Sequence, residues 1–408
     1  MNDTFKMIPW IKTALVNFCV VALAGVVLRY KINFPLSIVN QKYLLHAHSH
    51  FAFTGWITHT LYFLLVNLLR NNLGSIKEKI YRNLILINLV SAYGMLISFT
   101  IQGYGVISII FSTISILNSY VFSYFALKDL SLFPKGHPGK NWIKAAIWFG
   151  ILSTIGTIVL STMMSTHDYD LTTYLGSIYF FLHFQYNGWF LFACLGIFID
   201  KIKIILENKK QVQYSFWLFF LSGIPAYFLS TLWAHLPIWL YILVVLAAIL
   251  QVIGWFILIK VLLSNFEKLK SIFSKSAMIL FIIVALALTL KLFLQLGSTI
   301  PEVSKLAFGF RPIVIAYLHL VLLLIVTGFL LTFMYGTGIL HQSKNARTPL
   351  LAFFAAIILN ELVLAVQGIA AFSYTIIPCV NETLFAIALM LLTSAFFLAR
   401  AQFKNSPV

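Results

Sequence analysis

The sequence predicts an all-α integral membrane protein with twelve transmembrane helices in a pseudo-threefold, 4+4+4 arrangement. The first observation is composition: 61% of the residues are hydrophobic and only 10% are charged. A soluble globular domain carries about 25% charged residues. The second observation is a series of long apolar segments, and the third is a histidine-containing segment that recurs at a nearly constant spacing.

Twelve apolar segments are each long enough to cross about 30 Å of hydrocarbon as a helix. In chain order we expect them at residues 10–29, 44–69, 83–102, 105–127, 142–164, 174–199, 214–235, 237–263, 276–296, 312–335, 350–372 and 382–403. We expect no domain outside the membrane, so residues 1–408 form a single membrane domain.

The net charge of +17 is explained by topology rather than by nucleic-acid binding, because the basic residues lie in short loops and not in one patch. They follow the second, fourth, sixth, eighth and tenth segments: Arg70, Lys77, Lys79, Arg82; Lys128, Lys135, Lys140; Lys201, Lys203, Lys209, Lys210; Lys268, Lys270, Lys275; Lys344, Arg347. By the positive-inside rule these loops and both termini face the cytoplasm. We expect a multi-pass protein of the bacterial cytoplasmic (inner) membrane, in contact with lipid.

Three segments repeat one pattern, a Leu-His pair in an apolar run that leads to a Gly-aromatic step. They read LHAHSHFAFTGW from Leu45, LHFQYNGW from Leu182 and LHLVLLLIVTGF from Leu318. The spacing is 133 residues from His50 to His183 and 136 from His183 to His319. Each interval corresponds to about four spans with their loops, which predicts a threefold internal repeat.

The expected topology places a layer of histidines in the outer part of the bilayer: His46, His48, His50, His183, His235 and His319. A single intramembrane histidine is usually an interhelical hydrogen-bonding group. Several at one depth favour a haem or metal site, because imidazole is a common ligand for iron and copper. His46 and His50 are four residues apart and share a helix face, whereas His48 points elsewhere.

At these residues the chain resembles subunit I of the haem-copper oxidase superfamily, which includes the membrane nitric oxide reductases. Leu45-His46 looks like the family's first axial ligand of a low-spin haem. The segment Ala316-Tyr317-Leu318-His319 is similar to the family's AHxH motif. The resemblance implies a b-type haem with His46 and His319 as axial ligands, with His50 as the alternative one helical turn away.

The second metal centre of that superfamily is only partly matched. Trp233-Ala234-His235-Leu236 keeps one of two expected histidines, and His183 with Asn187 and Gly188 resembles the nitric oxide reductase pattern HxxxEG with Asn in place of Glu. Tyr317 stands where the high-spin haem's proximal His would be. The resemblance therefore implies an incomplete site for copper or non-haem iron, formed by His183, His235 and Asn187.

These matches lead us to expect a redox or nitric oxide related protein, with an oxidoreductase favoured. The expected partners are an electron-donor protein or quinol and a diatomic gas, nitric oxide or oxygen. Arg311 and Lys291 could pair with haem propionates or extend to the outer interface. Glu361 is a candidate proton relay, and a neutral, hydrogen-bonded carboxyl is the alternative.

Two other classes remain open. The NnrS family of twelve-helix bacterial haem and copper proteins, involved in nitric oxide tolerance, has a similar second helix and would account for the incomplete centre. A twelve-helix secondary transporter is the alternative without a cofactor. It fits poorly because such transporters are built as six plus six helices, whereas the repeat here is in thirds.

Overall fold

The computed structural model describes residues 7–166, 170–234, 236–304, 311–372 and 375–404, and every regular element in these ranges is helical. Eleven helices in the described part are long and apolar enough to cross a membrane. They are Met7–Asn33, Gln41–Leu73, Glu78–Gln102, Val106–Ser131, Lys140–Met163, Leu171–Ile202, Ile238–Ser264, Lys275–Gly297, Pro312–Gly336, Lys344–Ala371 and Val380–Phe403. The expected all-α membrane fold is confirmed, and eleven of the expected spans match these helices to within several residues.

The seventh expected span, 214–235, is not one straight helix. It consists of α9 (Lys209–Gly223) and the 3-10 helix η3 (Pro225–Thr231), which meet at an angle of 49° and together make the possible twelfth span. Pro225 explains the break, because proline has no backbone N–H and its ring clashes with the preceding helical turn. His235, which this span was expected to carry, lies outside the described residues.

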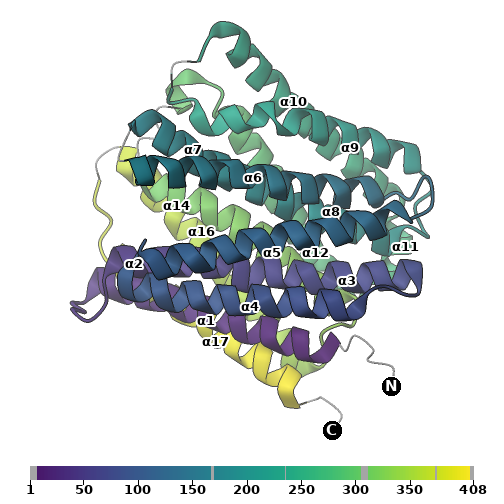
Figure 1. Ribbon diagram of the computed structural model, residues 1–408, viewed down its shortest axis with the longest axis horizontal. Coiled ribbons are helices and arrows are strands. Elements are labelled where there is room, and N and C mark those ends of the chain that lie inside the picture. The colour runs from purple at the N-terminus through teal and green to yellow at the C-terminus, as the bar shows by residue number, and fades with distance from the viewer. Residues whose placement is uncertain (1–6, 167–169, 235, 305–310, 373–374, 405–408) are drawn as a thin grey trace. The chain divides into compact units, whose positions relative to one another are not determined.

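The helices form two compact units, described in turn. The first unit is residues 1–132 and 330–408. Its helices are α1 (Met7–Asn33), α2 (Gln41–Phe51), α3 (His59–Leu73), α4 (Glu78–Gln102), α5 (Val106–Ser131), α16 (Lys344–Phe372) and α17 (Val380–Lys404). Here α17 packs on both α16 and α1, so the first and last helices of the chain lie side by side (Figure 1).

The second unit is residues 133–329. Its helices are α6 (Lys140–Thr166), α7 (Leu171–His183), α8 (Leu191–Ile202), α9, η3, α10 (Ile238–Ser264), α11 (Phe266–Ile272), α12 (Lys275–Gly297) and α14 (Arg311–His319), and α15 (Gly328–Gly336) begins at its end. α6 packs on α7 and α8, and α10 packs on α9 and α12. Asp170 caps the start of α7, accepting the Thr173 backbone N–H at 2.7 Å.

Each of the three Leu-His segments leads into a short π-helical stretch. These are η1 (Ala52–Thr58) between α2 and α3, η2 (Phe184–Phe190) between α7 and α8, and η4 (Leu320–Thr327) between α14 and α15. η2 and η4 begin directly after His183 and His319, and η1 begins two residues after His50. The similarity of the three sequences thus extends to a similar local backbone. π-helical turns are rare and occur frequently at functional sites.

Glycines allow α6 to approach α7 and α8 closely. A Cβ atom added at Gly156 of α6 would lie 2.5 Å from the Ser177 carbonyl oxygen of α7, and one at Gly196 of α8 would lie 2.6 Å from the Ile143 side chain of α6. Close approach at small residues is typical of helix association in membranes. This packing holds α7, which ends at His183, against α6.

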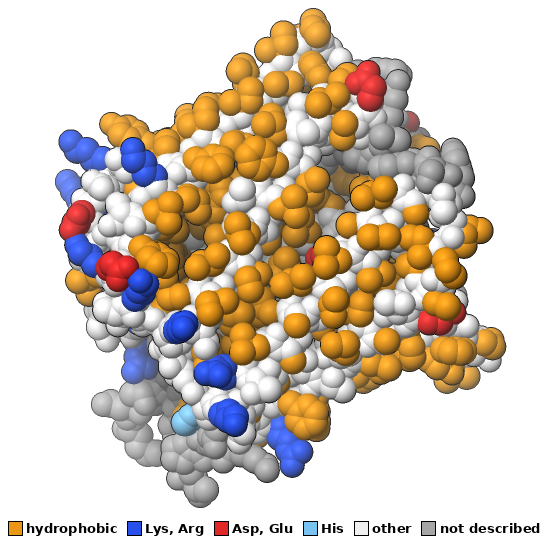
Figure 2. Space-filling model, turned by 180° about the vertical axis from the view of Figure 1, so that it is seen from behind, with side chains coloured by type: hydrophobic (Ala, Val, Ile, Leu, Met, Phe, Trp, Pro, Cys, Tyr) orange, Lys and Arg blue, Asp and Glu red, His pale blue; other side chains and the backbone are white. Residues whose placement is uncertain are grey.

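The surface carries many exposed apolar side chains. Hydrophobic residues cover much of the face in Figure 2. Ile101, Val106 and Ile238 are each more than 70% exposed. Apolar side chains on this scale are expected to face lipid rather than water.

Candidate functional site

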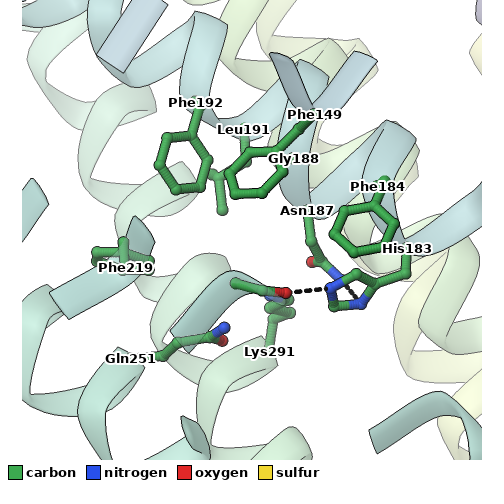
Figure 3. A pocket seen from close by; sticks show the side chains of 11 residues that line it. Phe149, His183, Phe184, Asn187, Gly188, Leu191, Phe192, Phe219, Gln251 and Lys291 are labelled. Carbon is green, nitrogen blue, oxygen red and sulfur yellow. Dashed lines mark hydrogen bonds between the residues drawn. The ribbon is translucent and has the colours of Figure 1, made fainter. Parts of the chain in front are cut away.

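The second unit contains a small polar cavity beside His183, with room for about one water molecule (Figure 3). Its polar lining comes from four side chains on four helical segments: His183 at the end of α7, Asn187 in η2, Gln251 on α10 and Lys291 on α12. Its apolar lining includes Phe149, Phe184, Phe192 and Phe219.

Both ring nitrogens of His183 have hydrogen-bond partners. Nε2 lies 2.9 Å from the Gly223 carbonyl oxygen, which can only accept, so Nε2 carries the proton and donates. Nδ1 lies 3.1 Å from Nδ2 of Asn187, which donates to it. The Gly223 carbonyl is at the break between α9 and η3, so His183 satisfies a backbone acceptor at the break.

The cavity is unlike a cation site. Lys291 is 1% exposed, and no carboxylate is among the residues described as lining the cavity. The Asn187 Oδ1 atom is buried and has no hydrogen-bond partner in the described part of the chain. In Figure 3 the Lys291 and Gln251 side chains lie on the same side of the cavity, facing His183 and Asn187.

These contacts do not fit the copper or non-haem iron ion implied by the sequence resemblance. His183 and Asn187 come together as expected. However, Asn187 bonds one ring nitrogen of His183 and the Gly223 carbonyl bonds the other, so neither nitrogen is left for a metal. A nearby lysine would also repel a metal cation. Among the described residues no group of three or more His, Cys, Asp or Glu side chains could hold a metal. The third expected ligand, His235, is outside those residues.

The first unit contains the expected histidine pair of α2. The rings of His46 and His50 lie 4.7 and 6.0 Å from the ring of Tyr104, and His50 stacks on Phe99 at 4.3 Å. The prediction that they share a face is therefore confirmed. His48 points elsewhere, because its Cε1 atom is 3.5 Å from a Cβ added at Gly25 of α1.

The two histidines of this face differ in their polar contacts. His50 Nε2 lies 3.3 Å from the Tyr104 hydroxyl. His46 Nε2 is buried and has no hydrogen-bond partner in the described ranges. A buried ring nitrogen without a hydrogen-bond partner is unfavourable unless another atom binds it. A haem iron can bind such a nitrogen, with the imidazole as its axial ligand. The residues of this face therefore fit axial haem ligation, and His46 fits better than His50.

His319, the second expected haem ligand, lies in the second unit at the end of α14. Its Nδ1–H donates to the Ile315 carbonyl oxygen at 2.8 Å, which leaves the lone pair on Nε2. Ligating imidazoles usually donate their other ring N–H to a carbonyl or carboxylate in this way. Tyr317, two residues earlier, lies in the same unit with its ring 6.4 Å from the ring of Tyr186.

Two further expected residues are Glu361 and Arg311. Glu361 lies within α16, where its Oε1 accepts a hydrogen bond from Nδ2 of the neighbouring Asn360 at 3.1 Å. Arg311 is the first residue of α14, and its side chain is outside the described part of the structure. Among the described polar contacts, Glu361 bonds only Asn360. This contact agrees with the alternative that Glu361 is a neutral, hydrogen-bonded carboxyl rather than a proton relay.

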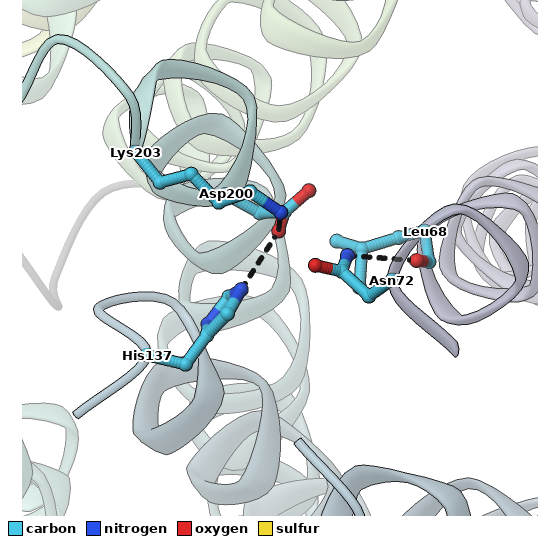
Figure 4. A network of polar contacts seen from close by, with 5 residues as sticks. All are labelled: Leu68, Asn72, His137, Asp200 and Lys203. Atoms are coloured by element: carbon cyan, nitrogen blue, oxygen red, sulfur yellow. Dashed lines mark hydrogen bonds and ion pairs between the residues drawn. The ribbon is translucent and has the colours of Figure 1, made fainter. Parts of the chain in front are cut away.

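A separate polar cluster lies at the end of α8 (Figure 4). Asp200 Oδ1 is 3.0 Å from His137 Nε2 and 2.9 Å from Lys203 Nζ. Gly139 lets this loop approach α8, because a Cβ there would lie 2.7 Å from the Gly196 carbonyl oxygen. The cluster ties the loop before α6 to α8. Asn72, also drawn, bonds the Leu68 carbonyl of its own helix, α3, at 2.9 Å.

Comparisons with known proteins add no relative. No protein-family model matches the chain, and no curated protein sequence matches it.

Sequence reasoning missed two groups of buried polar residues. Gln251 lines the His183 cavity, and Asn17 with Asn88 contacts the π-helical stretch η1. The signal was present, since polar side chains inside apolar segments are costly and usually have partners. Their partners could not be identified without the packing of the helices.

Proposed function

We propose that this protein is a membrane haem protein that carries single electrons, with a b-type haem ligated by His46 and His319. The observation that carries the proposal is the buried Nε2 of His46, which has no hydrogen-bond partner among the described residues, beside a second histidine whose Nε2 is already hydrogen-bonded to Tyr104. The His319 tautomer supports the second ligand. A haem with two imidazole ligands gains and loses one electron and leaves no coordination position for a substrate.

We extend the proposal to the architecture. The three π-helical stretches, each placed after an equivalent histidine, support three repeats of four spans, with each stretch in the second span of its repeat. The basic residues of the even loops support cytoplasmic termini in a bacterial inner membrane. Electrons would come from a protein or quinol in the same membrane.

The proposal favours electron transfer over gas reduction. Tyr317 replaces a proximal histidine, and the contacts of His183 do not fit a metal ion. Oxygen reduction in the superfamily that the motifs resemble requires both a five-coordinate haem and a metal with three histidine ligands. In the NnrS-like alternative, nitric oxide would bind only after one of the two imidazoles leaves the iron, and it would not be reduced at a second metal.

The test is the haem content and absorption spectrum of the purified chain in detergent. We expect bound b-type haem with sharp α and β bands on reduction, typical of a six-coordinate low-spin iron. His319→Ala should lose this spectrum, and His341→Ala should keep it, because His341 lies in an exposed loop. Protein purified with haem available but showing no Soret band would overturn the proposal and favour the transporter alternative.

A further inference from the structure

The π-helical stretch η1 is bonded from outside by asparagine side chains. In an α-helix the His59 N–H would bond the Gly55 carbonyl, but here it bonds the carbonyls of Thr54 and Trp56. Asn17 of α1 supplies a donor instead, with Nδ2 2.5 Å from the Gly55 oxygen. Asn88 of α4 donates to the Thr54 oxygen at 3.0 Å.

Asn17 is itself held in place. Its Oδ1 accepts the Tyr93 hydroxyl of α4 at 2.8 Å, so both ends of its amide are bonded. Asn17 is 0% exposed and Asn88 is 1% exposed. Away from water an unbonded carbonyl is unfavourable, so Asn17, by bonding the Gly55 oxygen, stabilises the wider π turn relative to a regular α turn.

The π turn fixes the rotation of the segment that carries the histidines. One residue of an α-helix corresponds to about 100° of rotation, since the helix has 3.6 residues per turn. If η1 relaxed to a regular helix, α2 would therefore turn by about this angle relative to α3. His46 and His50 would then leave the side on which they meet Phe99 and Tyr104.

We propose that Asn17, Asn88 and Tyr93 are positioning residues that hold the π turn of η1 and thereby aim the His46 imidazole at the haem iron. This inference rests on the proposed function. Asn17 makes the decisive bond, because it satisfies the carbonyl that the π turn frees. Tyr93 acts through Asn17, and Asn88 secures the preceding residue.

The chain offers a matched control. Asn118 of α5 is also a buried asparagine in the first unit, 5% exposed, and its Nδ2 donates to the Leu84 carbonyl at 3.1 Å. Leu84 lies in the regular helix α4, and among the described hydrogen bonds neither Leu84 nor Asn118 contacts η1. Asn118→Ala therefore removes the same kind of bond without touching η1.

The experiment compares Asn17→Ala, Tyr93→Phe and Asn118→Ala with the wild-type protein. The readouts are haem per polypeptide, the optical spectrum and the electron paramagnetic resonance g values of the oxidised iron, which depend on the orientation of the imidazole planes. We expect Asn17→Ala to lose haem or to shift the g values, with part of the iron becoming high-spin. Tyr93→Phe should give a smaller shift in the same direction, and Asn118→Ala should match the wild type.

The outcomes separate the inference from the proposed function. If the wild-type protein binds no haem, the proposed function fails and this inference fails with it. If the wild type binds haem and Asn17→Ala keeps both the haem content and the g values of Asn118→Ala, the inference alone fails. Should Asn17→Ala not fold, Tyr93→Phe decides: g values equal to those of the wild type would overturn the inference.

Discussion

The close contact between α6 and α7 gives a sharp stability prediction. Gly156→Ala places a Cβ 2.5 Å from the Ser177 carbonyl oxygen and 2.9 Å from the Phe181 backbone nitrogen. Ordinary contacts between heavy atoms are about 3.5–4.0 Å, so α7 would have to move away by about 1 Å. Because the obstructing atoms are backbone, no side-chain rotation can relieve the clash. Overpacking of this kind costs about 1–3 kcal/mol.

Gly150→Ala is the matched control on the same helix. Its Cβ would lie 3.6 Å from the Trp189 side chain, which is an ordinary contact. Both variants gain about 1 kcal/mol because alanine is a better helix former than glycine. That gain cancels in the comparison, so Gly156→Ala should be less stable than Gly150→Ala by about 1–3 kcal/mol.

The assay is unfolding of the detergent-solubilised protein by sodium dodecyl sulfate, followed by circular dichroism. We expect the midpoint of Gly150→Ala to equal or exceed that of the wild type, and the midpoint of Gly156→Ala to fall clearly below that of Gly150→Ala. Equal midpoints for the two variants would refute the reasoning. They would mean that α6 and α7 are not in backbone contact at Gly156.

Three further predictions follow from single sites. Lys291→Met should raise the free energy of unfolding by about 1–3 kcal/mol in the same assay, because it removes a buried amine from a cavity that no described carboxylate lines. A decrease in the free energy of unfolding would show instead that the amine makes stabilising bonds. Hydrogen bonds from Thr173 lower the pKa of Asp170 below its ordinary value of 3.8, so its stabilising effect is present above that pH and is lost as the pH falls through the lowered pKa. Asp170→Asn should therefore lower the midpoint at pH 6 and flatten its decline towards pH 3, and equal declines in both proteins would contradict this. Reduced wild-type protein should not consume oxygen at an oxidase-like rate in an oxygen electrode, because under the proposed motif resemblance Tyr317 stands where the proximal histidine would be; rapid reduction of oxygen to water would contradict the electron-transfer proposal.

The spans could be predicted from the sequence because the membrane imposes one strong rule. A segment must be apolar over about 20 residues to cross the hydrocarbon, and hydropathy alone detects such segments. Hydropathy did not reveal the break in the seventh span, because a broken helix has the same hydropathy as a straight one. Pro225 directly after Gly223-Ile224 was the available signal for the break.

The histidine positions were predicted in part. Four-residue spacing correctly placed His46 and His50 on one face, and the motif resemblance grouped His183 with Asn187, which the structure also brings together. The spacing could not show that Asn187 bonds His183 directly, since that depends on side-chain rotation. Nor could it place Lys291 in the His183 cavity, because this requires knowing how α12 packs against the helices that carry His183 and Asn187.

The π turns were not predictable from local sequence. η1, η2 and η4 share a Gly-aromatic step at or near their ends, but the same residues occur in regular helices. For η1, the π turn is stabilised by Asn17, which is 38 residues away from Gly55 along the chain. Tertiary hydrogen bonds of this kind decide the backbone conformation, and only the packed structure shows them.

The central claim is that His46, and not His50, ligates a haem. The most direct measurement is the reduced-minus-oxidised absorption spectrum of His46→Ala beside His50→Ala, with haem per polypeptide measured on the same samples. We predict that His46→Ala loses the six-coordinate low-spin spectrum, because of the two histidines on this face only His46 has an Nε2 without a hydrogen-bond partner among the described residues. His50→Ala should keep that spectrum. Loss of the spectrum in His50→Ala with its retention in His46→Ala would contradict the claim.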